Sequence, residues 1–104
     1  MAYPRGLVDQ RTLATTSETE LVQARTSNHF KQGLAAYLYS ASVGGTMSLY
    51  YTDQNGNDRL LSTAAVTSAD LTVISVDFPV PFAKLKFTPA SGTSSVVTSE
   101  VIGK

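Results

Sequence analysis

The residues with reactive side chains are few, and their spacing argues against catalysis. Nucleophilic catalysis needs a nucleophile, a base and a group that orients the base. The sequence has one histidine, His29, and no cysteine, and its eight acidic residues are scattered over turns and strand ends. Glycoside hydrolysis would need two carboxylates held across a cleft, which this scatter does not indicate. We therefore expect His29 to be a polar turn residue, and the protein to be no enzyme and to need no cofactor.

The segment 53–58 has oxygen-bearing side chains on both sides of a glycine, as calcium loops do. The possible ligands are Asp53, Asn55, Asn57 and Asp58. The glycine comes too early for an EF-hand loop, however, and no glutamate closes the loop. Because Asn55-Gly56 also supplies the positive φ angles of a tight β-hairpin, we interpret the segment as a turn, with calcium binding as the weaker alternative.

Tyrosines are the most informative side chains. Tyr37 and Tyr39 share one face of a predicted strand, and Tyr50 and Tyr51 lie on the next strand along the chain. Such rings cover an apolar core, stack on sugars or fill an interface between subunits. Tyr51 is in line with the apolar face of its strand, so we expect it to be buried. The residues expected at an interface are Tyr3, Leu7, Leu13, Tyr37, Tyr39 and Tyr50.

Length and composition limit the kinds of fold and partner that are possible for the protein that positions these residues. A chain of 104 residues is expected to form one domain with one core. Its eight basic and eight acidic residues form no run of either sign, which argues against a nucleic-acid partner. No segment approaches the roughly 20 apolar residues of a membrane span, and the N-terminus lacks the apolar stretch of a signal peptide. We expect a protein that is made in the cytoplasm and has no membrane partner.

From Gly33 onward, apolar and polar residues alternate with a period of two, which predicts half-buried strands separated by turns. Pro79 and Pro81 cannot donate to a sheet and mark a corner. The high content of Ser and Thr also favours strands over helices. The strands are predicted at 34–39, 47–52, 59–62, 71–78, 83–87 and 95–102.

Residues 13–25 fit either a polar strand or a helix that begins at Ser17, with Glu20 at the capping-box position. Only Leu21 and Val22 would form the apolar stripe of such a helix, so we predict a strand.

The N-terminal residues have too few apolar groups to pack alone. Residues 1–16 are predicted to form an extended arm, ordered only against a partner chain or the edge of the domain itself, and residues 17–104 the folded domain. Seven or eight short strands with no crossover helix predict an all-β fold, a single antiparallel β-sandwich that is jelly-roll-like.

Two stretches of the chain combine strands and turns in a fixed order. A strand opened by Gly45-Thr46 leads into the turn at Asn55-Gly56, and the later strand 82–87 ends at a turn that contains Ser91-Gly92. This order resembles small β-sandwich proteins of tailed and other double-stranded DNA bacteriophages, in which a tryptophan follows the first turn where Arg59-Leu60 stands here.

The resemblance implies a virion component, made in the host cytoplasm, of the head decoration, spike or tail-associated type. Such proteins are often homo-trimers or other closed oligomers, so the implied partners are copies of the chain itself and other virion proteins. An N-terminal arm would suit strand addition to a neighbouring subunit.

A carbohydrate-binding module is the alternative function. Tyr37, Tyr39 and Tyr50 would then form a stacking platform for sugar rings, and the turn at 53–58 would hold calcium. A binding module would be a monomer that is stabilised by a glycan or by calcium, whereas a virion component would be an oligomer that responds to neither.

Overall fold

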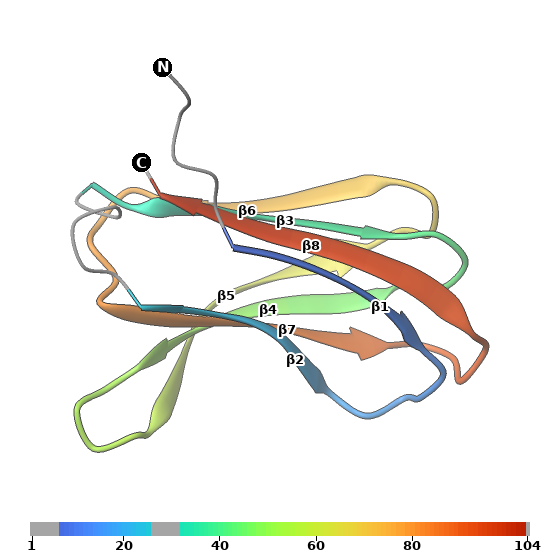
Figure 1. Cartoon of the computed structure of the whole chain (residues 1–104), viewed down its shortest axis with the longest axis horizontal. Coiled ribbons are helices and arrows are strands. Elements are labelled where there is room, and N and C mark those ends of the chain that lie inside the picture. The colour runs from blue at the N-terminus through green and yellow to red at the C-terminus, as the bar shows by residue number, and fades with distance from the viewer. Residues whose placement is uncertain (1–6, 26–31, 104) are drawn as a thin grey trace.

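The computed structural model describes residues 7–25 and 32–103, which fold into two facing layers of antiparallel strands (Figure 1). Sheet A contains four strands in the order β1-β8-β3-β6, and sheet B contains four in the order β2-β7-β4-β5. The eight strands are β1 (Leu7–Leu13), β2 (Thr19–Arg25), β3 (Leu34–Ser40), β4 (Gly45–Thr52), β5 (Asp58–Val66), β6 (Leu71–Val76), β7 (Phe82–Pro89) and β8 (Ser95–Gly103).

The strand pairs are nested within one another along the sequence. β4 pairs with β5, and the next pairs outward are β3 with β6, β2 with β7 and β1 with β8. The chain therefore follows the path of one long hairpin that is wound over two sheets, which is the topology of a jelly roll. This confirms the predicted all-β, antiparallel, jelly-roll-like sandwich.

The core follows from the alternation of side chains along each strand. In β7, burial alternates at every residue, with Leu85 and Phe87 inside and Lys84 and Lys86 on the outer face. Because successive side chains of a strand point to opposite faces, each sheet has one apolar side that it can bury only against the other sheet. The fully buried large side chains between the sheets include Leu34, Leu38, Met47, Leu49, Leu85, Phe87, Val97 and Val101.

The hairpin between β4 and β5 turns at the predicted place, but of Asn55 and Gly56 only Gly56 has the predicted positive φ. Gly56 has a φ of 82°, a left-handed conformation that glycine adopts without steric cost. The backbone closes through a hydrogen bond from the Gly56 amide to the Asp53 carbonyl and another from the Asp53 amide to the Asn57 carbonyl, each 3.0 Å long. In Figure 1, the tip of this hairpin extends beyond the lower layer at the left of the view.

In the first third of the chain, the structure decides between the alternatives that the sequence leaves open. Residues 19–25 form β2, a strand, as predicted. Residues 7–13, which the sequence analysis assigned to the arm, form β1 and pair with β8 over seven residue pairs at the edge of sheet A. The arm was expected to be ordered against either a partner chain or the edge of the domain itself. Residues 7–13 pair with the edge of the domain. The sandwich therefore includes residues before 17.

Two other boundaries differ from the prediction. β5 runs to Val66, beyond the predicted end at 62, because Gly45, Thr46 and Met47 of β4 continue to pair with it. β6 ends at Val76, two residues before the predicted end. In the part of the chain that the structure describes, no helix is long and apolar enough to cross a membrane.

Candidate functional site

The outer face of sheet A is apolar along the neighbouring strands β3 and β6, with further apolar side chains on β1 and β8. The backbone register places Val8, Glu100, Tyr37 and Val73 in one row across the sheet, and Gln10, Thr98, Tyr39 and Leu71 in the next. Five of the seven exposed large hydrophobic residues in the described structure lie on this face. They are Val8, Tyr39, Leu71, Val73 and Val96. With the half-buried Tyr37, these five residues are called the apolar face below.

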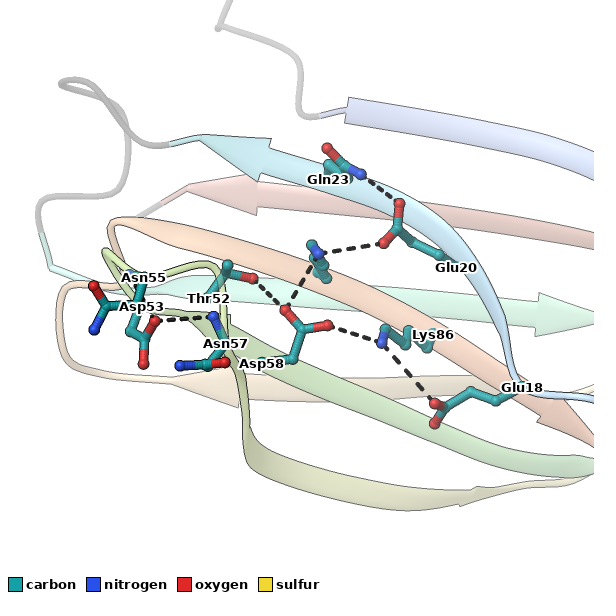
Figure 2. A network of polar contacts seen from close by, with 10 residues as sticks. Glu18, Glu20, Gln23, Thr52, Asp53, Asn55, Asn57, Asp58 and Lys86 are labelled. Carbon is teal, nitrogen blue, oxygen red and sulfur yellow. Dashed lines mark hydrogen bonds and ion pairs between the residues drawn. The ribbon is translucent and has the colours of Figure 1, made fainter.

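The outer face of sheet B has the opposite character, because an ion-pair network covers it (Figure 2). Asp58 is its centre. The Lys84 ammonium lies 3.2 Å from Oδ1 of Asp58, and the Lys86 ammonium lies 3.0 Å from Oδ2. Each lysine also reaches a second carboxylate, since Lys84 lies 3.7 Å from Glu20 and Lys86 lies 4.0 Å from Glu18. The network ties β2, β5 and β7 together.

Neutral groups complete the network. The Thr52 hydroxyl donates to Asp58 over 2.8 Å, and this bond, followed by that from Lys86, lowers the pKa of Asp58 to about 2. The Tyr50 hydroxyl donates to Glu18 over 2.9 Å, and the Lys86 ammonium lies 4.4 Å from the centre of the Tyr50 ring. Burial and the bond to Glu18 raise the pKa of the Tyr50 phenol. The charges of this face are therefore satisfied by one another.

The carboxylates of the turn at 53–58 bind other groups of the protein. Oδ1 of Asp53 accepts hydrogen bonds from the amides of Asn55 and Asn57, both 2.9 Å long, which lower the pKa of Asp53. Asp58 belongs to the network with the two lysines, whose positive charges oppose binding of a cation at the same oxygens. Figure 2 shows Asp53 at the turn and Asp58 directed toward Lys86. Across residues 7–25 and 32–103, no three His, Cys, Asp or Glu side chains gather as a metal site requires.

A shallow apolar pocket of about 280 Å³ lies near the start of the hairpin. It is lined by Tyr51, Leu61, Phe78, Pro79, Val80 and Pro81. Its volume is just below the range of about 300–1,000 Å³ that is usual for small-molecule sites. Tyr51 packs against the core, as its position in β4 predicted.

The residues predicted to form an interface are divided by the fold. Tyr37 and Tyr39 lie on the apolar face of sheet A, whereas Tyr50 lies on the outer face of sheet B, where its ring and hydroxyl belong to the ion-pair network. The three-tyrosine platform expected of a carbohydrate-binding module is therefore not formed, because consecutive strands β3 and β4 belong to different sheets.

The other predicted residues have separate positions. Leu13 is partly buried and packs against the core, so it is not an open contact surface. Leu7 begins β1 opposite Val101. Tyr3 and His29 lie outside the described residues.

The residues predicted at an interface did not include Val8, Leu71, Val73 and Val96, which the structure exposes on this face. Burial alternates along β6, with Ile74 and Val76 inside and Leu71 and Val73 outside, although all four are aliphatic. The period of two at 71–76 and 95–102 was the available signal, since one of the two faces of each strand had to lie outside.

Comparison with known proteins gives structural neighbours only. No protein-family model matches the chain, and no curated protein sequence matches it. The Yersinia pseudotuberculosis-derived mitogen is similar in structure, with a TM-score of 0.64 at 10% sequence identity, over 98% of this chain and 88% of that chain. The protein PirA has a TM-score of 0.66 at 10% identity, over 96% of this chain and 95% of that chain.

A third neighbour is the SPBc2 prophage-derived protein YomS. It has a TM-score of 0.51 at 18% identity, and the match covers 97% of this chain and 98% of that chain. At these identities, the likenesses show a shared small all-β fold. One fold of this kind serves unrelated functions, so the function must be argued from the surface.

Proposed function

We propose that the chain is a non-enzymatic structural component of a bacteriophage virion, which acts through contacts with copies of itself and with other virion proteins. The observation that carries this proposal is the apolar face of sheet A. Large contiguous apolar patches are rare on soluble monomers and are typical of interfaces between proteins. In this small domain, five of the seven exposed large hydrophobic side chains of the described residues lie on sheet A, whereas two lysines pair with a carboxylate on sheet B.

Two further observations support a phage origin. The order of strands and turns from Gly45 to Ser91-Gly92 resembles small phage sandwich proteins, and the structure forms strands β4 and β7 at the corresponding places. One structural neighbour of nearly equal length, YomS, is prophage-derived. The proposed site of action is the virion, after synthesis in the host cytoplasm.

The first experiment tests the virion assignment and the role of the apolar face together. Particles produced from the genome that encodes the chain are purified on a density gradient and examined for the protein with an antibody. We expect the chain in the particles. We also expect Tyr39→Lys to lose attachment, because it places a charge in the middle of the apolar face on the inner strand β3.

Leu60→Lys is the matched control. Leu60 is 57% exposed on β5 of sheet B, so the same lysine is added to the other side of the molecule. Each variant is first shown by circular dichroism to fold. Absence of the chain from intact particles would contradict the virion assignment, and equal attachment of both variants would contradict the role of the apolar face.

A further inference from the structure

The sandwich has four edge strands, which are β1 and β6 in sheet A and β2 and β5 in sheet B. An edge strand pairs best with a further strand when its own ladder is regular, and a β-bulge disrupts the ladder. β2 has a bulge at Leu21, and β5 has one at Leu61. β1 pairs with β8 in an unbroken register of seven residue pairs, and no strand within the ranges 7–25 and 32–103 pairs with its other side (Figure 1). The outer side of β1 is therefore a regular edge.

Charged side chains near the middle of β1 limit the strands that can pair with it. These residues are Asp9 and Arg11. Opposite residues of paired strands lie close together, so a partner strand must present a positive residue opposite Asp9 and a negative one opposite Arg11. β6, the other edge with a regular register, contains no charged residue and specifies no partner in this way.

The Arg11 guanidinium is held beside this edge and has donors that the chain does not use. Its Nε donates to Asp9 over 2.7 Å, and its Nη2 donates to Asp9 over 2.9 Å and to the Leu21 carbonyl over 3.3 Å. A guanidinium has five N–H donors, and the two on Nη1 have no partner among the residues that the structure describes. The Arg11 side chain is 40% exposed. A further carboxylate can therefore bind at Nη1 while the bonds within the chain remain.

We propose that β1 pairs antiparallel with β1 of a second copy of this chain about a twofold axis at Gln10, which joins two copies of sheet A into one eight-stranded sheet. This inference rests on the proposed function and deepens it, since it specifies the contact between copies. β1 has seven residues, so full overlap places Gln10 opposite Gln10 of the partner subunit. Asp9 then lies opposite Arg11 of the partner subunit, and Arg11 lies opposite Asp9 of the partner subunit. A second copy thus supplies both charges that this edge requires.

The faces and the charges of β1 together specify this register. Successive residues of a strand point to opposite faces, so a shift by one residue would place inner side chains of one copy opposite outer side chains of the other. A shift by two residues keeps the faces, but it places Asp9 opposite itself in one direction and Arg11 opposite itself in the other. Full overlap avoids both conflicts. The twofold axis is perpendicular to the joined sheet, so the two apolar faces lie on the same side of the dimer.

An exchange of charges tests the pairing. The wild type should have the mass of two chains, or of a larger even number, in light scattering coupled to size-exclusion chromatography. Asp9→Arg and Arg11→Asp each place like charges opposite each other across the axis, so each should have half the wild-type mass. An equimolar mixture of the two variants brings opposite charges together between chains and should recover the wild-type mass. Mixing does not restore the ion pair within either chain, so recovery reports the contact between copies.

Asp70→Arg is the matched control. It makes the same change of charge at an exposed residue beside β6, the opposite edge strand of sheet A, and should leave the mass unchanged. Circular dichroism first shows that each variant folds. A monomeric wild type, an unchanged mass for Asp9→Arg, or a mixture that stays at half the wild-type mass would overturn the pairing.

Single introduced cysteines test the register, because the chain has no cysteine of its own. Gln10→Cys would face its own copy at a Cα distance of about 4.5–5.5 Å, within the limit of about 7 Å for a disulfide. Val8→Cys and Thr12→Cys would face each other, and each would lie roughly 14 Å from its own copy, four residues along the strand. Under mild oxidation, we expect covalent dimers from Gln10→Cys and from a mixture of the other two variants, but not from either of those alone. No dimer at position 10, or an equal amount of dimer from Val8→Cys alone, would contradict the proposed pairing.

The proposed function and the pairing of β1 can fail separately. If the wild type is monomeric, but the chain is found in particles and Tyr39→Lys loses attachment, the proposed function stands and the β1 pairing fails. If the chain is absent from particles, but the mixture of Asp9→Arg and Arg11→Asp recovers the wild-type mass, the pairing stands and the virion assignment fails.

Discussion

Replacing Asp58 by asparagine tests how far the ion-pair network stabilises sheet B. The carboxylate accepts from Thr52 and contacts two lysines, and its pKa falls from 3.8 to about 2 on folding. This depression corresponds to at most about 2.5 kcal/mol. The Asp58 side chain is 24% exposed, so water screens its charge, and we expect Asp58→Asn to lower the free energy of unfolding by about 1 to 1.5 kcal/mol.

The pH dependence gives the prediction its sign. The pKa of Asp58 is lower in the folded state, so its stabilising effect is full above the unfolded value of 3.8 and is lost as the pH falls toward 2. The difference in unfolding free energy between the wild type and Asp58→Asn should therefore be constant above about pH 5 and approach zero near pH 2. Urea unfolding followed by far-ultraviolet circular dichroism, at one protein concentration and several pH values, measures this difference.

Asp70→Asn is the control. Asp70 is exposed and accepts a hydrogen bond from the Leu71 amide, which asparagine can also accept. We expect a change within about 0.5 kcal/mol. If the effect of Asp58→Asn is no larger than that of the control, or does not decline toward acid pH, the network contributes little stability and our reasoning about it is wrong.

Four other substitutions test individual features. The hydroxyl of the buried Ser99 has no partner in the described structure, so Ser99→Ala should raise the free energy of unfolding by about 1 kcal/mol. Ser95→Ala removes a buried hydrogen bond of 2.8 Å to Ser40, so it should lower the free energy of unfolding by about 1 kcal/mol. Ala69 has a φ of 59°, and Ala69→Gly should raise the melting temperature slightly by relieving strain of about 1 kcal/mol. A Cβ at Gly45 would lie 2.2 Å from the backbone oxygen of Thr88, so Gly45→Ala should cost about 2 to 3 kcal/mol, measured by urea unfolding.

The strands could be predicted from the sequence because the apolar and polar residues along each strand show which of its faces is buried. The alternation in 34–39 and 83–87 marks which side chains are buried, and Asn55-Gly56 marks a hairpin. The choice of partner strand could not be predicted. Tyr37 and Tyr50 lie on consecutive strands, and whether they share a surface depends on the connection at 41–44, which crosses from one sheet to the other.

The ion-pair network could not be predicted from the sequence for the same reason. Lys84 and Lys86 were expected on a solvated face, as they are, but their acidic partners come from β2, the residue before it, and β5. These partners lie far away in the sequence, and only the sheet order brings them together. The apolar face was found in part, through Tyr37 and Tyr39, because aromatic side chains on the outer face of a strand are conspicuous.

The nested pairing of strands has a consequence for how the chain folds during synthesis. The hairpin of β4 and β5 closes a loop of a few residues, whereas β1 must wait for β8, which is made after the other seven strands. The entropy cost of closing a loop increases with its length, so the outer pairs are favoured once the inner pairs have shortened the path between them. Folding should therefore spread outward from the Asn55-Gly56 hairpin, and β1 remains an unpaired strand until the last residues of β8 leave the ribosome.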